Sequence, residues 1–339
     1  MTETTNSTLI PLSPSAEKIV VVGAHTQLGE QIIQELEKRP EVKEYWVVDL
    51  HSPKKRAYQK LRFIQLDLIA PGADATLAEE LKKIGASCIL HTALKNNPSL
   101  NWVYAHELEV IGTLNLVSAA KAAQVKKFIL CSTTAVYGAS PKNPNYLTES
   151  HPVCEKACSY FVKDKIEAEK QVLKILNEAP QITVTLLRFC LIVGPRSHNY
   201  FTELFRRSVV PTLLGYDPLM QFIHERDAIR ALKLVLYGDH PGVFNIVGRG
   251  VIPLSYALRK AGKWSLPLWP ALAYPSIQSL WNLQMVSVPA RLLDFFRYSW
   301  VADGSKASEV LGFEAKRSSK DAFLEFAKSE RIERMSLSA

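Results

Sequence analysis

The sequence predicts a doubly wound α/β fold, in which helices cover both faces of a parallel sheet. Short apolar runs alternate with amphipathic segments long enough to form helices, and the first apolar run leads directly into a glycine-containing turn. Helical crossovers between parallel strands produce this alternation. At 339 residues, the chain is long enough for one large domain or two ordinary ones.

Each apolar run before residue 195 is expected to form a buried strand. The expected strands are 18–22, 45–50, 62–66, 87–91, 127–131 and 182–187. The segments between them carry apolar residues at helical spacing. The expected helices are 29–38, 77–84, 102–123 and 161–177.

After residue 194 the alternation becomes less regular, and this part is expected to form a smaller, mostly helical cap. Ligands of doubly wound domains bind at the carboxyl ends of the strands, which the cap would cover. The runs 219–223 and 243–247 still resemble strands, so 221–247 is expected to return to the sheet. The predicted organisation is a flexible tail at 1–16, a first domain at 17–194, a cap region at 195–330 and a tail at 331–339.

Composition narrows the function classes. The net charge is +8, but the basic residues form scattered pairs such as Lys126–Lys127, which indicates a solvated basic surface and no nucleic-acid partner. Five cysteines without paired CxxC spacing argue against a disulfide framework and suit a reducing cytoplasm. Cys154 and Cys158 lack a neighbouring His or Cys cluster, so no metal site is expected. Residues 1–16 lack the basic and apolar regions of a signal peptide.

The turn at residues 22–29 has the features of a dinucleotide cradle. It follows a strand and opens a helix, whose free N–H groups and dipole attract a pyrophosphate. Gly23 permits the tight turn and Gly29 permits close packing of helix and strand. Thr26 occupies the middle glycine position, where the backbone approach to a pyrophosphate is therefore less free.

Two acidic residues extend this cradle. Asp49 ends the second expected strand, where its carboxylate could bind both adenosine ribose hydroxyls and repel a 2′-phosphate. This favours NAD over NADP, although the basic triplet Lys54–Arg56 lies just downstream. Asp67 follows the third expected strand and could contact the adenine edge. The alternative is that both carboxylates simply cap loops.

Later motifs resemble those of a known superfamily. They are Cys-Ser-Thr-Thr-Ala-Val-Tyr-Gly at 131–138, Lys-Ile-Glu-Ala-Glu at 165–169, Val-Gly-Pro at 193–195 and Gln-Phe-Ile-His-Glu-Arg-Asp at 221–227. In this order they resemble the extended short-chain dehydrogenase/reductases, and within them the NAD-dependent epimerase/dehydratase family, including proteins labelled UDP-glucose 4-epimerase-like. The resemblance covers about residues 17–328. It implies an NAD-binding Rossmann domain at 17–194, a small-molecule substrate and a homodimer.

The resemblance also assigns site residues. In the family, a Ser or Thr, a Tyr and a Lys perform the chemistry; the first falls on Thr133 and the last on Lys165. The tyrosine position holds Phe161, which cannot exchange a proton. Tyr160 is one residue away, and could enter the site only if its helix starts late or carries a π-bulge. The cofactor-binding positions implied are Gly23, His25, Thr26, Gln27, Leu28, Gly29, Asp49, Asp67, Leu68, Thr92, Ala93, Lys165 and Cys190.

Two further positions depart from the family pattern. Glu109 stands where the family often has Asn, three residues before the Gly-Thr pair of the long helix. Met220 stands where sugar-nucleotide members commonly place a diphosphate-binding Arg. Arg206, Arg207 or Arg297 are the candidates to replace that Arg.

From Trp264 to Ala290 the sequence contains no charged residue. Its four prolines argue against a membrane-spanning helix. The simpler interpretation is a cap whose helices pack over the substrate pocket. The alternative is peripheral membrane contact, with basic flanks that suit anionic headgroups. The aromatic residues near the lipid interface would then be Trp264, Trp269, Tyr274 and Trp281.

Three functions follow from these patterns. The first is an NAD-dependent epimerase, dehydratase or oxidoreductase that acts by transient hydride transfer on a hydroxylated sugar, including a nucleotide-linked one. In it, Thr133 and Lys165 take part, and Tyr160 or the substrate supplies the missing acid–base group. The second is a non-catalytic NAD-binding sensor that has lost the chemistry at Phe161. The third is a membrane-surface dehydrogenase on a lipid-like alcohol. The expected location is the cytoplasm, at the membrane surface in the third case.

Overall fold

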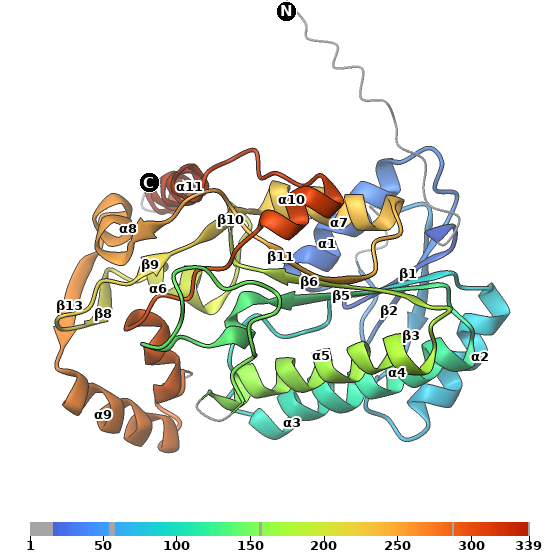
Figure 1. Cartoon of the computed structure of the whole chain (residues 1–339), viewed down its shortest axis with the longest axis horizontal. Helices are drawn as coiled ribbons and strands as arrows, with labels where there is room; N and C mark the ends of the chain where they lie inside the picture. The colour runs from blue at the N-terminus through green and yellow to red at the C-terminus, as the bar shows by residue number, and fades with distance from the viewer. Residues whose placement is uncertain (1–15, 54–57, 156–157, 287, 338–339) are drawn as a thin grey trace, which may run out of the picture.

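The centre of the molecule is a seven-stranded parallel sheet with helices on both faces (Figure 1). The computed structural model describes residues 16–53, 58–155, 158–286 and 288–337. The strand order is β11-β6-β5-β4-β1-β2-β3, and every pairing in this sheet is parallel. This confirms the predicted doubly wound class.

The six expected strands all belong to this sheet. They are β1 (Ile19–Val22), β2 (Tyr45–Asp49), β3 (Leu61–Gln65), β4 (Cys88–His91), β5 (Lys127–Thr133) and β6 (Thr183–Phe189), and β11 (Gly242–Ile246) is added at the edge. The chain runs outward from β1 to β3 and then returns to the opposite side of β1 as β4. The carboxyl ends of β1 and β4 therefore flank the switch point where doubly wound folds bind ligands.

Each face of the sheet has its own helical layer (Figure 1). On one face lie α1 (Gln27–Lys38), α7 (Glu225–Tyr237) and α10 (Ser305–Leu311). On the other face lie α2 (Ala73–Ile84), α4 (Gly112–Ala122) and α5 (Tyr160–Glu178). The long expected helix at 102–123 consists of α3 (Trp102–His106), a π-helical turn η3 (Glu107–Ile111) and α4.

The second half of the chain builds a cap from short strands and helices. Its strand pairs are β7 (Leu191–Val193) with β10 (Phe222–His224), β8 (Val209–Leu213) with β13 (Trp264–Leu268), and β9 (Leu219–Met220) with β12 (Ile252–Pro253). Its helices are α6 (Tyr200–Arg206), α8 (Leu254–Ala261), α9 (Pro270–Asn282) and α11 (Ser319–Leu337), with the 3₁₀ segment η5 (Ala290–Phe296).

The expected return of 221–247 to the central sheet holds for β11, which covers the edge strand β6. The run 219–223 does not join this sheet, because β10 pairs with β7. The tail expected from residue 331 is helical up to Leu337, as the end of α11. This helix is held by Phe323 and Phe326, which are buried in the core beneath the cap. Residues 1–15 of the expected N-terminal tail lie outside the described residues, and the boundary at 194 stays a prediction.

Lys127 corrects the expectation that the pair Lys126–Lys127 belongs to a solvated surface. Its side chain is fully buried. Its Nζ donates to the carbonyl oxygens of Val235 at 3.1 Å and Gly238 at 3.0 Å, at the end of α7, and lies 2.7 Å from a carboxylate oxygen of Asp239. An ammonium at a helix C-terminus satisfies carbonyls that have no partner within the helix.

The substitution Lys127→Met is expected to lower the free energy of unfolding by about 2–4 kcal/mol, because it leaves buried carbonyls without a donor. The exposed neighbour Lys126 provides the control, and Lys126→Met should change stability by less than about 0.5 kcal/mol. Urea denaturation of both variants measures the difference. Equal effects would show that the buried ammonium does not cap α7.

Candidate active site

Atoms pack so closely around the turn between β1 and α1 that two positions accept only glycine. Gly23 has φ +88°, and a Cβ there would lie 2.6 Å from the Cα of Ala93. A Cβ on Gly29 would lie 2.1 Å from the carbonyl oxygen of Gly23. These approaches hold the start of α1 against the carboxyl end of β1.

Thr26, at the middle glycine position, is used by the turn itself. Its hydroxyl accepts from the N–H of Gly29 at 3.1 Å, and lies 2.9 Å from the Gly23 carbonyl oxygen and 3.0 Å from the Thr92 hydroxyl. It is thus the N-cap of α1. The remaining first-turn amides of the helix have no partner within the helix and stand at the ligand edge of the sheet. The cradle therefore fits a dinucleotide pyrophosphate despite the missing glycine.

The predicted ribose-binding carboxylate lies at the end of β2. One oxygen of Asp49 accepts from the N–H of Leu50 at 2.8 Å, and the other lies 3.1 Å from Nδ1 of His25. Asp67 accepts from the N–H of Ile69 at 3.1 Å and so orders its own loop. The triplet Lys54–Arg56 lies outside the described residues.

A cleft along the ends of β1, β2 and β4 brings most of the expected cofactor residues together. Those that line it are Gly23, His25, Thr26, Gln27, Asp49, Asp67, Leu68 and Ala93. A second cavity adjoins it and shares Thr26 and Gln27. The expected residues that line the second cavity are Leu28, Thr92, Thr133, Lys165 and Cys190. One continuous groove thus runs from the ribose carboxylate to the expected catalytic residues.

Two cysteines line the second cavity and are buried there. Burial raises the pKa of the Cys190 thiol to about 12, and it also raises the pKa of Cys131. Both side chains are therefore neutral thiols at neutral pH. They contribute small apolar surface and no nucleophile.

Thr133 and Lys165 reach this cavity from different elements. Thr133 is the last residue of β5, and its hydroxyl accepts from the N–H of Ala135 at 3.2 Å. Lys165 lies on α5 and is almost completely buried. The sheet and the helix thus bring a hydroxyl and an ammonium to one cavity, as expected for a site that holds a substrate oxygen and a ribose.

Phe161 also lines the cavity, whereas the structure does not bring Tyr160 into it. The Nζ of Lys165 lies 3.9 Å from the centroid of the Phe161 ring. The Tyr160 side chain is 64% exposed and stacks on Trp102 outside, with ring centroids 5.5 Å apart. Because α5 begins at Tyr160 as a regular α-helix, neither a late start nor a π-bulge turns this side chain inward.

The ammonium of Lys165 is paired with Glu109. Its Nζ donates to both carboxylate oxygens, at 2.8 and 3.0 Å, and the two side chains are 4% and 2% exposed. Glu109 lies on the π-helical turn η3, and it also accepts from the N–H of Lys95 at 2.6 Å. Burial raises the pKa of Glu109, and the Lys165 ammonium opposes this rise. The sequence showed only that Glu109 stands where the family often has Asn. Its contact with Lys165 was not predicted.

Sequence reasoning missed two aromatic residues of the cavity, Tyr200 and Trp300. Both are buried, and within the described part of the chain the Tyr200 hydroxyl and the Trp300 Nε1 have no hydrogen-bond partner. The Tyr200 ring contacts the Phe161 ring edge-on at 5.9 Å. Burial raises the pKa of Tyr200 well above its usual range, so it remains a neutral phenol that can donate a hydrogen bond. These two unpaired donors suit a ligand that carries acceptor oxygens.

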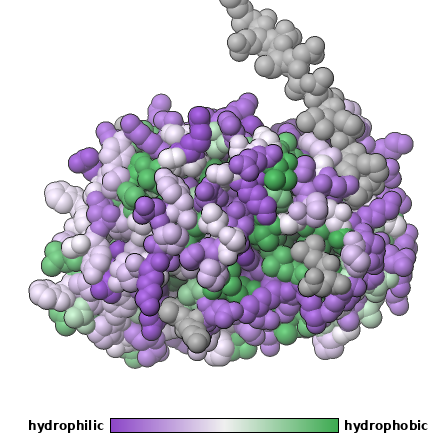
Figure 2. Space-filling view, in the orientation of Figure 1, coloured by the Kyte–Doolittle hydropathy of each residue, from purple (hydrophilic) through white to green (hydrophobic). Residues whose placement is uncertain are grey.

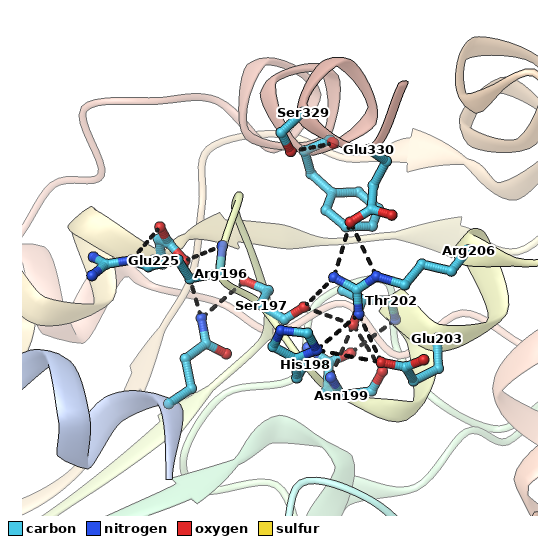
Figure 3. A network of polar contacts seen from close by, with 12 residues as sticks. Arg196, Ser197, His198, Asn199, Thr202, Glu203, Arg206, Glu225, Ser329 and Glu330 are labelled. Atoms are coloured by element: carbon cyan, nitrogen blue, oxygen red, sulfur yellow. Dashed lines mark hydrogen bonds and ion pairs between the residues drawn. The ribbon is translucent and has the colours of Figure 1, made fainter. Parts of the chain in front are cut away.

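Tyr200 is the first residue of α6, and both this helix and the turn before it are firmly anchored. Figure 3 shows the contacts that hold them. Arg206 donates to Glu330 at 2.9 and 3.0 Å, to Glu203 at 2.7 Å and to the carbonyl oxygen of Ser197 at 2.9 Å. Asn199 accepts from the N–H of Thr202 at 3.1 Å. Arg206 is thus committed to holding this segment in place, which argues against its use as a diphosphate ligand.

The other candidates for a diphosphate-binding arginine do not line the cavity either. Met220 is fully buried in the core beneath the cap. Arg207 is exposed at the end of α6. Arg297 donates to the Tyr216 hydroxyl at 2.8 Å and lies over several tyrosine rings.

The comparison with known families agrees with this geometry. Residues 19–247 match the NAD dependent epimerase/dehydratase family. The chain belongs to this family. Membership confirms the resemblance to the extended short-chain dehydrogenase/reductases and, because the family is NAD dependent, the predicted cofactor.

Several other proteins are similar to this chain in sequence or in structure. An uncharacterized protein of Mycobacterium tuberculosis is 28% identical over 91% of this chain and 83% of its own length. The human dTDP-D-glucose 4,6-dehydratase is 30% identical over 56% of this chain and 54% of that enzyme. MoeE5 in complex with UDP-glucuronic acid and NAD has a TM-score of 0.71 at 22% identity, covering 93% of this chain and 99% of MoeE5. At that identity the structural likeness supports the fold alone.

The substitution Gly23→Ala is expected to weaken NAD binding at least tenfold, because a Cβ would push Ala93 and distort the cradle. Gly72→Ala is the matched control. Gly72 also has positive φ, at +75°, but a Cβ there would meet no atom within 4 Å. Calorimetric titration with NAD compares the two, and equal affinities would contradict the role of the close approach.

Proposed function

We propose that the protein binds NAD along the ligand edge of its sheet and catalyses hydride transfer to and from a hydroxyl-bearing ring carbon of a sugar, including nucleotide-linked sugars. The observation that carries this proposal is the groove that joins the cleft at Gly23 and Asp49 to the cavity at Thr133 and Lys165. Bound NAD supplies the hydride acceptor. The substrate class is supported by the relatives that act on dTDP-glucose and UDP-glucose.

In this proposal, each cavity residue has a distinct task. The Thr133 hydroxyl holds the substrate oxygen, and the Lys165 ammonium holds the nicotinamide ribose. The neutral Tyr200 phenol and the Trp300 indole donate hydrogen bonds to further substrate oxygens. Phe161 contributes an apolar wall next to the reacting carbon. Because Phe161 cannot accept the proton that leaves the hydroxyl when the carbon is oxidised, a basic group of the substrate itself takes up that proton in this proposal.

Phe161 also supports a second candidate, a protein that binds NAD without turnover. A phenyl ring cannot take up the proton that leaves a hydroxyl during oxidation, and loss of such a group typically costs about 10²–10⁴ in rate. The two candidates share NAD binding and differ in whether the bound cofactor is ever reduced.

Mass spectrometry of small molecules released from the freshly purified, denatured protein is expected to detect NAD. The variant Lys165→Met should lower NAD affinity about tenfold, a loss of about 1.4 kcal/mol, since the ribose loses its ammonium partner. The exposed Lys163, on the same helix, provides the control Lys163→Met, which should bind normally.

The same protein is then mixed with UDP-linked and dTDP-linked sugars, and the near-ultraviolet absorbance of reduced nicotinamide is followed. Reduction by any of them supports the enzyme. NAD binding without reduction across the panel favours the non-catalytic candidate, and absence of any NAD binding contradicts both.

We also propose that the uncharged segment contacts a membrane surface. Six of its large apolar side chains are exposed, among them Trp264 at 78%, Leu272 at 69% and Met285 at 70%. In α9 only Ala273 is buried, which does not support the expected cap packed tightly over the pocket. Apolar and weakly polar residues accordingly gather at the left edge in Figure 2, where β8, β13 and α9 lie in Figure 1. Exposed apolar side chains that gather on one surface are typical of interaction sites.

The surroundings of this surface favour a lipid partner. No acidic residue occurs from 264 to 290, while Arg259, Lys260, Lys263 and Arg291 flank the segment. Tryptophan next to basic residues suits the interface of an anionic bilayer. Among the described residues, no helix is long and apolar enough to cross a membrane.

Flotation with vesicles that contain phosphatidylglycerol is expected to recover the protein, while vesicles of phosphatidylcholine alone should recover less. The double substitution Trp264→Ser and Trp269→Ser should reduce recovery at least fivefold, because both side chains would enter the interface. Trp102→Ser, at an exposed tryptophan on α3, serves as the control. Equal recovery of the unchanged protein, the double variant and the Trp102→Ser control would exclude membrane contact through this segment.

A further inference from the structure

Two departures from the family pattern, Glu109 and Phe161, meet at the same ammonium group. Glu109 comes from the π-helical turn η3 and Phe161 from the first turn of α5, so they are far apart in the sequence. Both carboxylate oxygens of Glu109 accept from the Nζ of Lys165, and the same nitrogen lies over the face of the Phe161 ring. The ammonium is therefore held between a carboxylate and an aromatic face.

A buried ammonium requires an anion nearby, because an unpaired charge at this depth costs several kcal/mol. The other acidic group close to this pair, Asp164, is already engaged with His106 at 2.8 Å. Glu109 is thus the carboxylate in direct contact with Lys165. Glu109 lines the neighbouring cleft with Tyr160 and Trp281, Lys165 lines the substrate cavity, and Phe161 lines both.

The pair also fixes the wall of the groove. Glu109 accepts from the backbone N–H of Lys95 at 2.6 Å, and Lys95 and Asn96 line both the cofactor cleft and the substrate cavity. One carboxylate therefore connects the loop after β4 to α5. The π-helical turn widens the helix at this point, which is a common way of placing a functional side chain.

We infer that Glu109 and Phe161 form one matched change. Glu109 is a positioning residue that serves as the anionic partner of Lys165 and also holds the loop at Lys95. The pairing commits the Lys165 ammonium to holding the cofactor ribose. With its charge already balanced, Lys165 is not available to activate a phenol. Restoring a tyrosine at position 161 is therefore insufficient to restore proton transfer while Glu109 is present. This inference rests on the proposed role of Lys165 in NAD binding, but its central test requires no cofactor.

The test measures the ionisation of a phenol introduced at position 161. We compare Phe161→Tyr with the double variant Phe161→Tyr/Glu109→Gln by ultraviolet difference absorbance during alkaline titration. From each titration curve we subtract the curve of the matching protein that retains Phe161, so that the absorbance changes of the 12 native tyrosines cancel. The single variant should titrate at or above the usual value of about 10. The double variant should titrate at least about one unit lower, because the freed ammonium then favours the phenolate.

Glu107→Gln is the matched control, since Glu107 lies on the same turn but is exposed. Combined with Phe161→Tyr, it should titrate like the single variant. Identical phenol titration in the presence and absence of Glu109 would overturn the inference.

A double-mutant cycle on the melting temperature, Tm, tests the same inference if one of these variants folds poorly. Glu109→Gln and Lys165→Gln should each lower Tm, because each leaves one buried charge unpaired. The double variant should recover part of that loss. Strictly additive losses would overturn the pairing role.

NAD titration of Glu109→Gln separates this inference from the proposed function. A threefold or larger loss of affinity relative to the Glu107→Gln control is expected. Unchanged affinity would overturn the assignment of Lys165 and its pair to the cofactor. If no variant binds NAD, including the unchanged protein, the proposed function and this assignment fail, while the phenol titration still decides whether Glu109 balances Lys165.

Discussion

The parallel pairing of β1 with β4 is the constraint on which the site depends. Their register sets Val22 beside His91, so the residues that follow each strand, Gly23 and Thr92, meet at one edge of the sheet. Thr92 donates from its backbone N–H to the Val22 carbonyl oxygen at 2.9 Å, and its hydroxyl lies 2.9 Å from the Gly23 carbonyl oxygen. A side chain at position 23 would separate these segments. The cofactor turn is therefore closed by the sheet as much as by its own glycines.

Burial then determines the chemistry that this edge can support. The thiols of Cys131 and Cys190 and the phenol of Tyr200 are all held neutral by the apolar cavity. Lys165, a buried cation that lines the cavity near Phe161, is balanced by Glu109. The cavity thus presents hydrogen-bond donors and apolar walls, a combination suited to orienting a hydroxylated ring against a nicotinamide.

The cap divides into a part that shapes this cavity and a part that faces away from it. Arg206 ties α6 to α11, and α6 begins with Tyr200, whose ring lies beside Phe161. The Tyr200 hydroxyl has no hydrogen-bond partner among the residues that the structure describes. The β8–β13 pair and α9 instead leave tryptophan and leucine side chains outward. A residue such as Trp281, at the end of α9, still lines the cleft beside Tyr160, so the outward surface and the site share a boundary.

The sequence by itself determined the doubly wound sheet and the turn at Gly23. These follow from local rules: apolar periodicity and a glycine where the backbone needs positive φ. Thr133 and Lys165 were assigned through the resemblance to the family's motifs, and their roles and that of Asp49 stay predictions. The sequence also identified Glu109 and Phe161 as departures. Only the tertiary structure decided that these two residues contact the same ammonium, that Lys127 is buried under α7, and that β10 leaves the central sheet. Each of these is a contact between segments distant along the chain, and such contacts depend on how elements pack, which no local pattern of residues encodes.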